Sequence, residues 1–242
     1  IFLERSIDGI EKHDGIKGFF QLNKLIKSYS FDKAFILHQS CRYALLCKLA
    51  GIKNILGYGR NFQFLFLSPL IFNKNFFNKN FNIYEEAINF TKMITNNKEF
   101  KRNAEIIITK KEKEDFDIKY KFSQKKNIII GIGGSGPTVK WPIENWITLI
   151  DYLNKNFRTN FIIAGGKNEE VEFNLIKEKL RIDNIFSLCN LNIREAIVGM
   201  SFGKFFIGND SGMHHLAASI GIHTLVLIGS TPLNYTKYST FM

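Results

Sequence analysis

The second half of the chain alternates short apolar runs with longer segments in which apolar residues recur at helical spacing. The runs predict strands at residues 126–131, 161–164, 185–188, 205–208 and 224–228. The segments between them predict helices at residues 143–156, 169–180 and 193–200. Continuous apolar runs are typical of strands that are buried on both faces of a sheet. The strict alternation therefore predicts an α/β domain with a parallel, doubly wound sheet.

The first half shows the same alternation less regularly. It predicts strands at residues 31–38 and 55–58, and helices at residues 6–30, 42–50 and 84–95. The segment from residue 61 to residue 81 is an aromatic, Asn-rich loop, and its pattern predicts no helices or strands within it. Residues 110–126 are dense in charge, which we interpret as a connection between domains. We therefore expect a partial N-terminal domain over residues 1–125 and a second domain over residues 126–242.

Length and cysteine content narrow the class of protein. The chain has 242 residues, 45% of them hydrophobic, which suffices for two domains with cores. It begins at Ile1 and stops just after a predicted turn, so we interpret it as a fragment. Cys41, Cys47 and Cys189 are too few and too scattered for a disulfide framework or a thiolate metal site, which indicates a reducing compartment. No run approaches the roughly 18 to 20 apolar residues of a transmembrane helix.

The positive charge of the chain is unevenly distributed. Residues 1–125 hold 22 Lys and Arg against 13 Asp and Glu, whereas residues 126–242 hold 11 against 9. One interpretation is a solvated surface in a Lys-rich chain, and the other is attraction to an anionic partner. No RNA- or DNA-binding motif accompanies the basic half, so we do not expect nucleic acid as a partner.

Three polar turns follow predicted strands, and in a doubly wound sheet such strand ends lie where ligands bind. The first, Gly131–Gly136, has the spacing G-x-G-x-x-G of dinucleotide-binding turns. Pro137 and Pro142 prevent a helix from opening on these glycines, and Pro137 also occupies the Lys position of a P-loop. A tight exit from the strand is the structural alternative, but Lys140 beside small hydroxyl residues suits phosphate contact.

The second turn runs from Gly165 to Glu169. Its two glycines allow a ligand to approach closely, and the Glu169 carboxylate can accept hydrogen bonds from ribose or sugar hydroxyls. The alternative role for Glu169 is compensation of the helix dipole in the first helical turn.

The third turn places Asp210 and Ser211 just before a predicted helix, whose free N–H groups form an anion site. A carboxylate repels phosphate, so Asp210 indicates a ligand that carries hydroxyl groups as well, such as a nucleotide-sugar. The alternative for Asp210 is an N-cap. His214 and His215 follow, and we expect their side chains to diverge on the helix, so that at most one of them is a ligand. A buried core position is the alternative for His215, and no partners for a metal site are evident.

Four ordered motifs resemble those of glycosyltransferase family 9, the heptosyltransferases. They are G-I-G-G-S-G-P-T-V-K-W-P from Gly131, I-I-A-G-G-K-N-E from Ile162, G-N-D-S-G-M-H-H-L-A-A-S from Gly208 and L-V-L-I-G-S-T-P from Leu225. They cover roughly the second half of the chain, and an ordered set of four is far more specific than any one of them. The first half is similar more faintly, through residues 31–40 and 51–57.

The resemblance implies a fold of the GT-B type, with two Rossmann-like domains that have parallel sheets, the first of them incomplete here. The first domain would bind the acceptor and the second the nucleotide-sugar. The implied donor is ADP-heptose, and the implied acceptor is a lipid-linked anionic oligosaccharide, the inner core of lipopolysaccharide. The enzyme would be bacterial and cytoplasmic, with room for peripheral contact at the inner face of the inner membrane, and would use no cofactor.

The resemblance also implies roles for individual residues. Lys140 would contact the phosphate or sugar of the donor and stabilise the leaving group, in an inverting reaction that needs no metal. Ser135 would lie near the phosphates and Glu169 near the nucleoside or sugar. The sugar and diphosphate would be held by Asp210, Ser211, Gly212 and His215. The catalytic Asp of the family is expected before Ile1, so we expect the fragment itself to be inactive.

Two other functions compete with this one. The chain can be a nucleotide-sugar-binding module without catalytic activity. It can also be an NAD-dependent oxidoreductase that uses the Gly131–Gly136 turn. The second alternative is disfavoured because the strand at residues 161–164 leads to glycines instead of the acidic residue that binds ribose.

Overall fold

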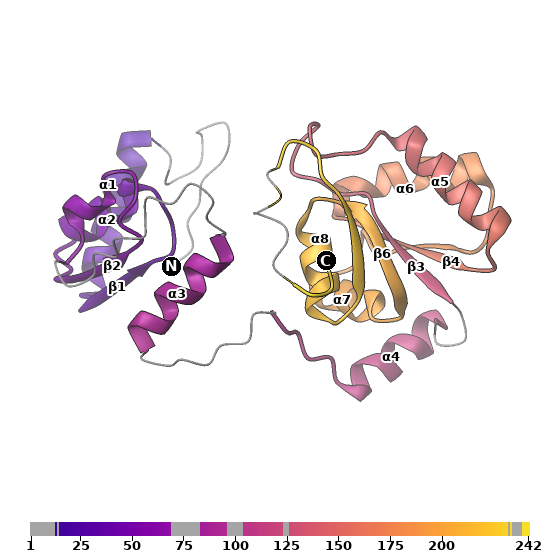
Figure 1. Ribbon diagram of the computed structural model, residues 1–242, viewed down its shortest axis with the longest axis horizontal. Coiled ribbons are helices and arrows are strands. Elements are labelled where there is room, and N and C mark those ends of the chain that lie inside the picture. Colours follow the sequence, from indigo (N-terminus) through magenta and orange to yellow (C-terminus); the bar gives the residue numbers. More distant parts are fainter. Residues whose placement is uncertain are drawn as a thin grey trace. The chain divides into compact units, whose positions relative to one another are not determined.

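The computed structural model describes residues 13, 15–68, 83–95, 104–122, 126–231, 233 and 239–242. The chain divides into two compact units, Ile1–Phe100 and Lys101–Met242 (Figure 1). Among the described residues, no helix is both long enough and apolar enough to span a bilayer.

The second unit contains a five-stranded parallel sheet with the strand order β5-β4-β3-β6-β7. Its strands are β3 (Asn127–Gly131), β4 (Asn160–Ala164), β5 (Ile185–Ser187), β6 (Gly203–Asn209) and β7 (His223–Leu227). Its described helices are α4 (Lys110–Tyr120), α5 (Ile143–Asn156), α6 (Glu170–Leu180), α7 (Ile193–Met200) and α8 (Gly212–Ser219), with a short 3-10 helix, η3 (Lys167–Glu169). The predicted alternation of strands and helices is confirmed.

Helices cover both faces of this sheet (Figure 1). Ile129 and its neighbours on one face pack with residues of α4, α7 and α8. Ile130 and Ile163 belong to the other face and pack with Trp146 of α5 and Ile176 of α6. Because consecutive strand residues point to opposite faces, a continuous run of Ile fills two cores at once. This is the doubly wound arrangement that the sequence predicted.

Helix α4 corrects the expectation of a connection over residues 110–126. The two compact units divide between Phe100 and Lys101, earlier than the sequence suggested. The charged residues of α4 conceal a single buried side chain, Phe116, which packs with Phe122 and Phe202 in a core of the second unit. One aromatic anchor is too sparse a pattern to identify as a packed helix from its spacing.

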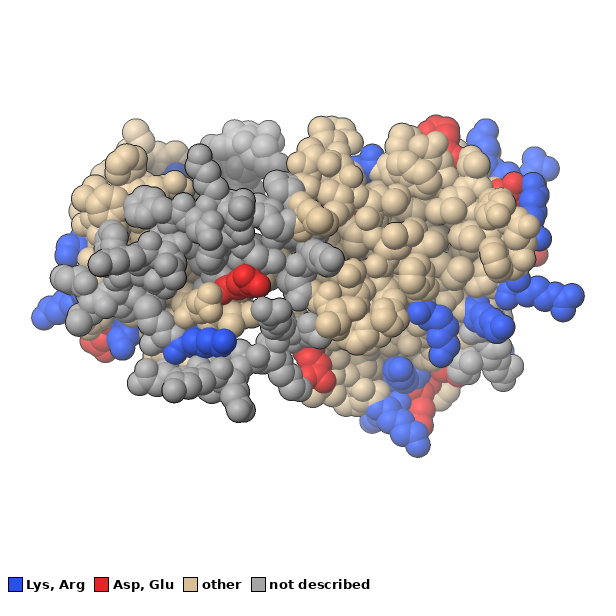
Figure 2. Space-filling view, in the orientation of Figure 1, with Lys and Arg blue, Asp and Glu red and all other residues tan. Residues whose placement is uncertain are grey.

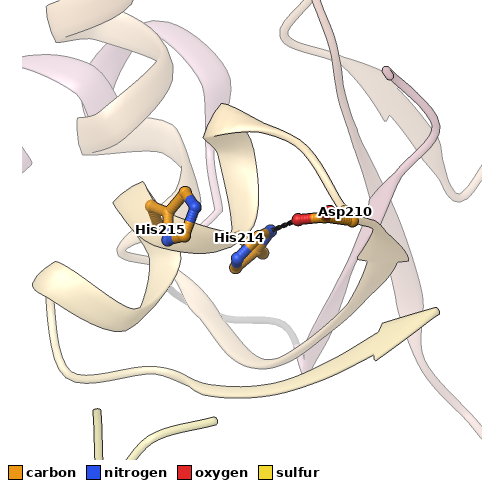
Figure 3. A group of neighbouring side chains, drawn as sticks. All are labelled: Asp210, His214 and His215. Carbon is orange, nitrogen blue, oxygen red and sulfur yellow. Dashed lines mark ion pairs between the residues drawn. The ribbon is translucent and has the colours of Figure 1, made fainter. Parts of the chain in front are cut away.

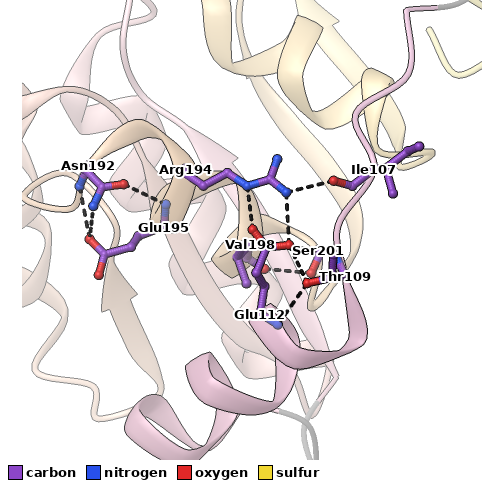
Figure 4. Close-up of polar contacts among 8 residues, drawn as sticks. All are labelled: Ile107, Thr109, Glu112, Asn192, Arg194, Glu195, Val198 and Ser201. Carbon is purple, nitrogen blue, oxygen red and sulfur yellow. Dashed lines mark hydrogen bonds and ion pairs between the residues drawn. The ribbon is translucent and has the colours of Figure 1, made fainter.

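Polar contacts also attach α4 to the second unit (Figure 4). Thr109 caps the helix and exchanges hydrogen bonds with Glu112 in a capping box. Arg194 of α7 reaches Glu112 with its Nε at 2.7 Å from Oε1, and donates from Nη2 to the Ile107 carbonyl at 2.7 Å. The segment before β3 is therefore part of the second unit.

The first unit has a smaller described core. Its two strands, β1 (Lys33–Ile36) and β2 (Asn54–Gly57), pair in parallel. Its helices are α1 (Gly15–Ser28), α2 (Cys41–Leu49), α3 (Ile83–Thr95) and the 3-10 helix η1 (Gln63–Phe66). Gly51 follows α2 with a φ of +87°, which confirms the predicted helix end. Most of residues 6–14 and residues 69–82 of the aromatic segment lie outside the described residues.

Charged side chains are dispersed on the face drawn in Figure 2. Lys and Arg occur singly or in small groups, with Asp and Glu among them. The described surface on this face therefore favours scattered solvation over one concentrated basic patch.

Candidate functional site

The strand order places a candidate site at the carboxyl end of the sheet in the second unit. Strand β3 lies in the middle, with β4 on one side and β6 on the other. The chain thus winds outward in both directions from β3, and ligands of doubly wound sheets bind at such a reversal. The nominated residues lie in the segments that follow β3, β4 and β6. They are Ser135 and Lys140 after β3, Glu169 in η3 after β4, Asp210 and Ser211 after β6, and Gly212 and His215 in α8.

Lys140 and Glu169 form an ion pair across two of these turns. Lys140 Nζ lies 2.9 Å from Glu169 Oε1 and 3.2 Å from Glu172 Oε1. Glu169 Oε2 also accepts a hydrogen bond from the Gly166 N–H at 2.8 Å. Burial acts to lower the pKa of Lys140, but the hydrogen bonds that Lys140 donates to both glutamates and the attraction of their charges together outweigh it and raise that pKa. Lys140 is therefore a cation that two carboxylates hold in place. Together, Lys140, Glu169 and Glu172 carry a net negative charge.

Glu172 was not among the residues that the sequence nominated. A signal was present, because Glu172 lies three residues after Glu169 and residues at that spacing share a helix face. Glycines leave room for the cluster: a Cβ on Gly134 would lie 2.9 Å from Lys140 Cγ, and one on Gly165 would lie 2.8 Å from Glu169 Cβ.

Other glycines at the strand ends have a structural cause. Gly131 of β3 and Gly208 of β6 are paired in register, and a Cβ on either would collide with the ring of Phe206. These two glycines are required by the packing of an aromatic side chain and not by a ligand.

In the third turn Asp210 is not the N-cap residue, which was one alternative for it. The N-cap residue of α8 is Ser211. The Ser211 N–H donates to His214 Nδ1 at 3.1 Å, and the Asp210 N–H donates to the Leu227 carbonyl at 3.2 Å. The Asp210 carboxylate lies 3.7 Å from His214 Nδ1 (Figure 3). The Asp210 side chain therefore does not cap the helix.

The two histidines contact each other, which corrects the expectation that they diverge. Their ring centroids are 3.7 Å apart (Figure 3). Consecutive Cβ atoms do diverge on a helix, but rotation of both side chains brings the rings together. Burial, with a smaller effect of His215, lowers the pKa of His214 to about 4, and burial also lowers the pKa of His215. His214 is therefore uncharged at neutral pH, and its approach to Asp210 is not an ion pair.

The hydrogen bonds of His214 fix its tautomer. Nδ1 accepts from Ser211, so the ring proton of the neutral form resides on Nε2. Nε2 is buried and has no hydrogen-bond partner among the described residues, and the same holds for Ser211 Oγ. The sequence nominated His215 and not His214, whose Nδ1 lies 3.7 Å from Asp210 Oδ1.

The arrangement also has some features of a metal site. One ligand atom from each of Asp210, His214 and His215 lies within 4.8 Å of the others. Ligands of tetrahedral zinc, bound at about 2.0 to 2.1 Å, would lie about 3.4 Å apart. His214 Nδ1 already accepts a hydrogen bond, so the described geometry favours the capped helix start over a metal centre.

The remaining nominated residues border open space. Ser135 is exposed in the turn after β3. A Cβ on Gly212, the first residue of α8, would meet no atom within 4 Å. The start of α8 therefore presents backbone N–H groups to a space that a ligand can enter.

Comparisons with known proteins agree with the fold. A curated relative, lipopolysaccharide heptosyltransferase 1 from Campylobacter coli, is 30% identical over 121 residues, which cover 48% of this chain and 35% of the relative. The chain thus spans about a third of that relative.

Solved structures match a larger part of the chain. The E. coli ADP-heptose lps heptosyltransferase II matches with a TM-score of 0.66 and 17% identity, covering 92% of this chain and 70% of the other. The E. coli heptosyltransferase WaaC with ADP-2-deoxy-2-fluoro heptose matches with a TM-score of 0.64 and 15% identity, covering 91% and 68%. These likenesses confirm the predicted GT-B fold with parallel sheets.

The family model for "Glycosyltransferase family 9 (heptosyltransferase)" matches residues 19–240, which cover most of both compact units and every nominated residue. This chain therefore belongs to glycosyltransferase family 9.

Proposed function

We propose that the protein transfers a heptose, or a related sugar, from an ADP-sugar to a lipopolysaccharide core acceptor. The observation that carries the proposal is the pairing of two kinds of group at one sheet edge. Lys140 provides a held cation after β3, and the open start of α8 provides N–H groups after β6. Both kinds of group suit a diphosphate, and the carboxylates of Glu169 and Asp210 suit hydroxyl groups.

The relatives support the choice of donor. One E. coli relative was solved with ADP-2-deoxy-2-fluoro heptose, and another is described as an ADP-heptose lps heptosyltransferase. We assign Ser135, Lys140, Ser211 and Gly212 to the diphosphate, and Glu169, Asp210 and His215 to the sugar and nucleoside hydroxyls. The first unit, which holds 14 Lys and Arg against 8 Asp and Glu, would receive the anionic acceptor.

The proposed reaction is a direct displacement with inversion at the sugar carbon. Negative charge develops on the departing diphosphate, and preorganised donors placed where that charge develops lower the barrier. Lys140 would exchange one of its two carboxylate partners for a phosphate oxygen. The N–H groups at the start of α8, from Gly212 onward, would bind the other phosphate, because the Ser211 N–H already donates to His214. In this scheme the protein supplies the stabilising charge, and no metal is required.

Calorimetry on the whole chain tests the donor. We expect binding of ADP and ADP-heptose that weakens as salt rises, since the contacts are charge-assisted. Lys140→Ala should weaken ADP binding by on the order of tenfold or more, because a hydrogen bond to a charged group contributes about 1.5 to 3 kcal/mol. Lys155→Ala is the matched control, because Lys155 is also ion-paired but lies on the exposed side of α5. Tight binding of NAD without a response to ADP would instead favour an oxidoreductase.

A second variant tests the sugar contact. Asp210→Asn keeps the size of the side chain and is not expected to disturb a cap, because Ser211 is the N-cap. We expect affinity for ADP-heptose to fall while affinity for ADP alone changes little. An equal loss for both ligands would assign Asp210 to the architecture of the turn.

A further inference from the structure

Asn209, the last residue of β6, is a buried amide that joins two distant points of the chain. Its side chain is 0% exposed. Nδ2 donates to the Ile132 carbonyl at 2.8 Å, and Oδ1 accepts from the Trp141 N–H at 3.0 Å. Both polar atoms of the amide are therefore used, and both reach the turn that follows β3.

The two partners lie at opposite ends of that turn. Ile132 follows directly after β3, and Trp141 precedes Pro142 at the start of α5. Between them lie Ser135 and Lys140. One side chain from the neighbouring strand thus closes the whole turn, and fixing the ends of a loop restricts the conformations of everything between them.

A second contact holds the middle of the same turn. Ser230 Oγ lies 3.2 Å from Thr138 Oγ1, and a Cβ on Gly229 would collide with the Thr138 carbonyl. The turn is therefore supported from β6 at its ends and from the segment after β7 at its centre.

We propose that Asn209 is a positioning residue for the donor site, and this proposal rests on the function proposed above. Trp141 adjoins Lys140, and Asn209 adjoins Asp210, so the hydrogen bond between Trp141 and Asn209 sets the spacing of the two halves of the site. Asn209 itself is fully buried and acts on the ligand only through the turn. It determines where the Lys140 cation stands relative to the start of α8.

The chemistry of the position explains the residue type. The site needs one donor and one acceptor a few ångströms apart in a buried place, which an amide offers and a carboxylate does not. Leu is close to Asn in size but leaves the Trp141 N–H and the Ile132 carbonyl unpaired. Removing the amide should therefore release the turn and change the position of Lys140, with its glutamate partners, relative to the start of α8.

A buried Asn at the opposite edge of the same sheet is the matched control. Asn127, the first residue of β3, is 1% exposed and donates to the Phe122 carbonyl at 3.3 Å and the Phe202 carbonyl at 3.1 Å. It joins loops as Asn209 does, but at the amino end of the strands. If Asn209 only stabilised the fold, its replacement should change ADP affinity no more than replacement of Asn127 does.

The experiment compares ADP affinity and thermal stability for Asn209→Leu, Asn127→Leu, Lys140→Ala and the double variant of Asn209 and Lys140, all in the whole chain. We expect both Leu variants to melt earlier, and only Asn209→Leu to weaken ADP binding, by on the order of tenfold, as for one misplaced charged hydrogen bond. The double variant should bind ADP no more weakly than Lys140→Ala, because the two residues act through one contact.

Asn209→Ser replaces Asn209→Leu if the latter fails to fold, since a hydroxyl restores one of the two bonds, and it should show an intermediate loss. Unchanged ADP affinity in the folded Asn209 variant, equal losses at Asn127 and Asn209, or additive losses in the double variant would overturn the proposal and leave the proposed function standing. Failure of the unaltered chain to bind ADP would overturn both.

Discussion

The two units of this chain use the same alternation of strand and helix, yet they differ in how completely it is packed. In the second unit the central strands are covered on both faces, and Ile129 and Ile130 are fully buried. In the first unit the described sheet has two strands, and β1 is followed and lined by exposed apolar residues, with Phe35 46% and Leu37 55% exposed.

This difference explains why the functional signal lies in the second unit. The apolar residues of the central strands pack into the cores on the two faces of the sheet. The polar residues at the ends of these strands therefore have no role in that packing. Lys140, Glu169 and Asp210 stand out for that reason. At the strand ends of the first unit, the buried Gln63 side chain instead donates to the His38 and Ser40 carbonyls and accepts from the Gly59 N–H, so it holds the turns together.

The largest expected effect tests whether α4 packs as part of the second unit. Phe116→Ala should lower the free energy of unfolding of the second unit by about 3 to 5 kcal/mol, because it empties a buried aromatic site. Trp141 and Trp146 are the only tryptophans and both lie in the second unit, so fluorescence during urea unfolding reports on it. The control is Ile118→Ala on the same helix, where the side chain is 78% exposed and the change should be within about 0.5 kcal/mol. Equal effects of the two variants would restore the interpretation of residues 110–126 as a connection.

An intermediate effect concerns pH. The pKa of His214 is about 4 in the folded protein, below its ordinary value near 6.5, so the unfolded chain binds the proton more readily. Stability from this group is complete above about pH 6.5 and is lost as pH falls toward 4, by at most about 1.4 kcal/mol per pH unit. The lowered pKa of His215 acts in the same direction.

His214→Asn should flatten this pH profile, measured by tryptophan fluorescence in urea between pH 7 and pH 5. Asn keeps an acceptor for the Ser211 N–H but removes the titrating ring. His223→Asn is the control, since that side chain is exposed on β7. A profile that His214→Asn leaves as steep as before would contradict the assignment.

The smallest expected effect sharpens the comparison at the ion-pair cluster. Glu172→Gln should tighten ADP binding by roughly two- to fivefold, because it removes a carboxylate that competes with phosphate for Lys140 and a partly exposed pair contributes up to about 1 kcal/mol. Glu170→Gln is the control, since Glu170 accepts from Ser187 Oγ and no contact with Lys140 is described. Equal tightening by both variants, measured by calorimetry, would mean that only the local field matters.

The parts of the molecule that follow from local pattern were predictable from the sequence. The strand at residues 126–131 could be predicted because an uninterrupted run of Ile is typical of a strand that is buried on both faces. The end of α2 followed from Gly51, and the meeting of the polar turns at one end of the sheet followed from the parallel strands.

The parts that depend on side chains meeting across the fold were not predictable. Glu172 becomes a partner of Lys140 only when α6 packs beside the turn after β3. The role of Asn209 depends on contacts with residues far away in the sequence. Helix α4 was not predicted because most of its residues are charged and only one of them, Phe116, is buried.

Gly131, Phe206 and Gly208 carry a consequence for the evolution of this sheet. The ring of Phe206 occupies the space where both glycines would place a Cβ, so no one of the three can change in size independently. Relatives with a smaller residue at the position of Phe206 should carry larger residues at the other two positions. The three residues should therefore covary across the family as a single inherited choice, separate from the selection that acts on the neighbouring ligand-binding turns.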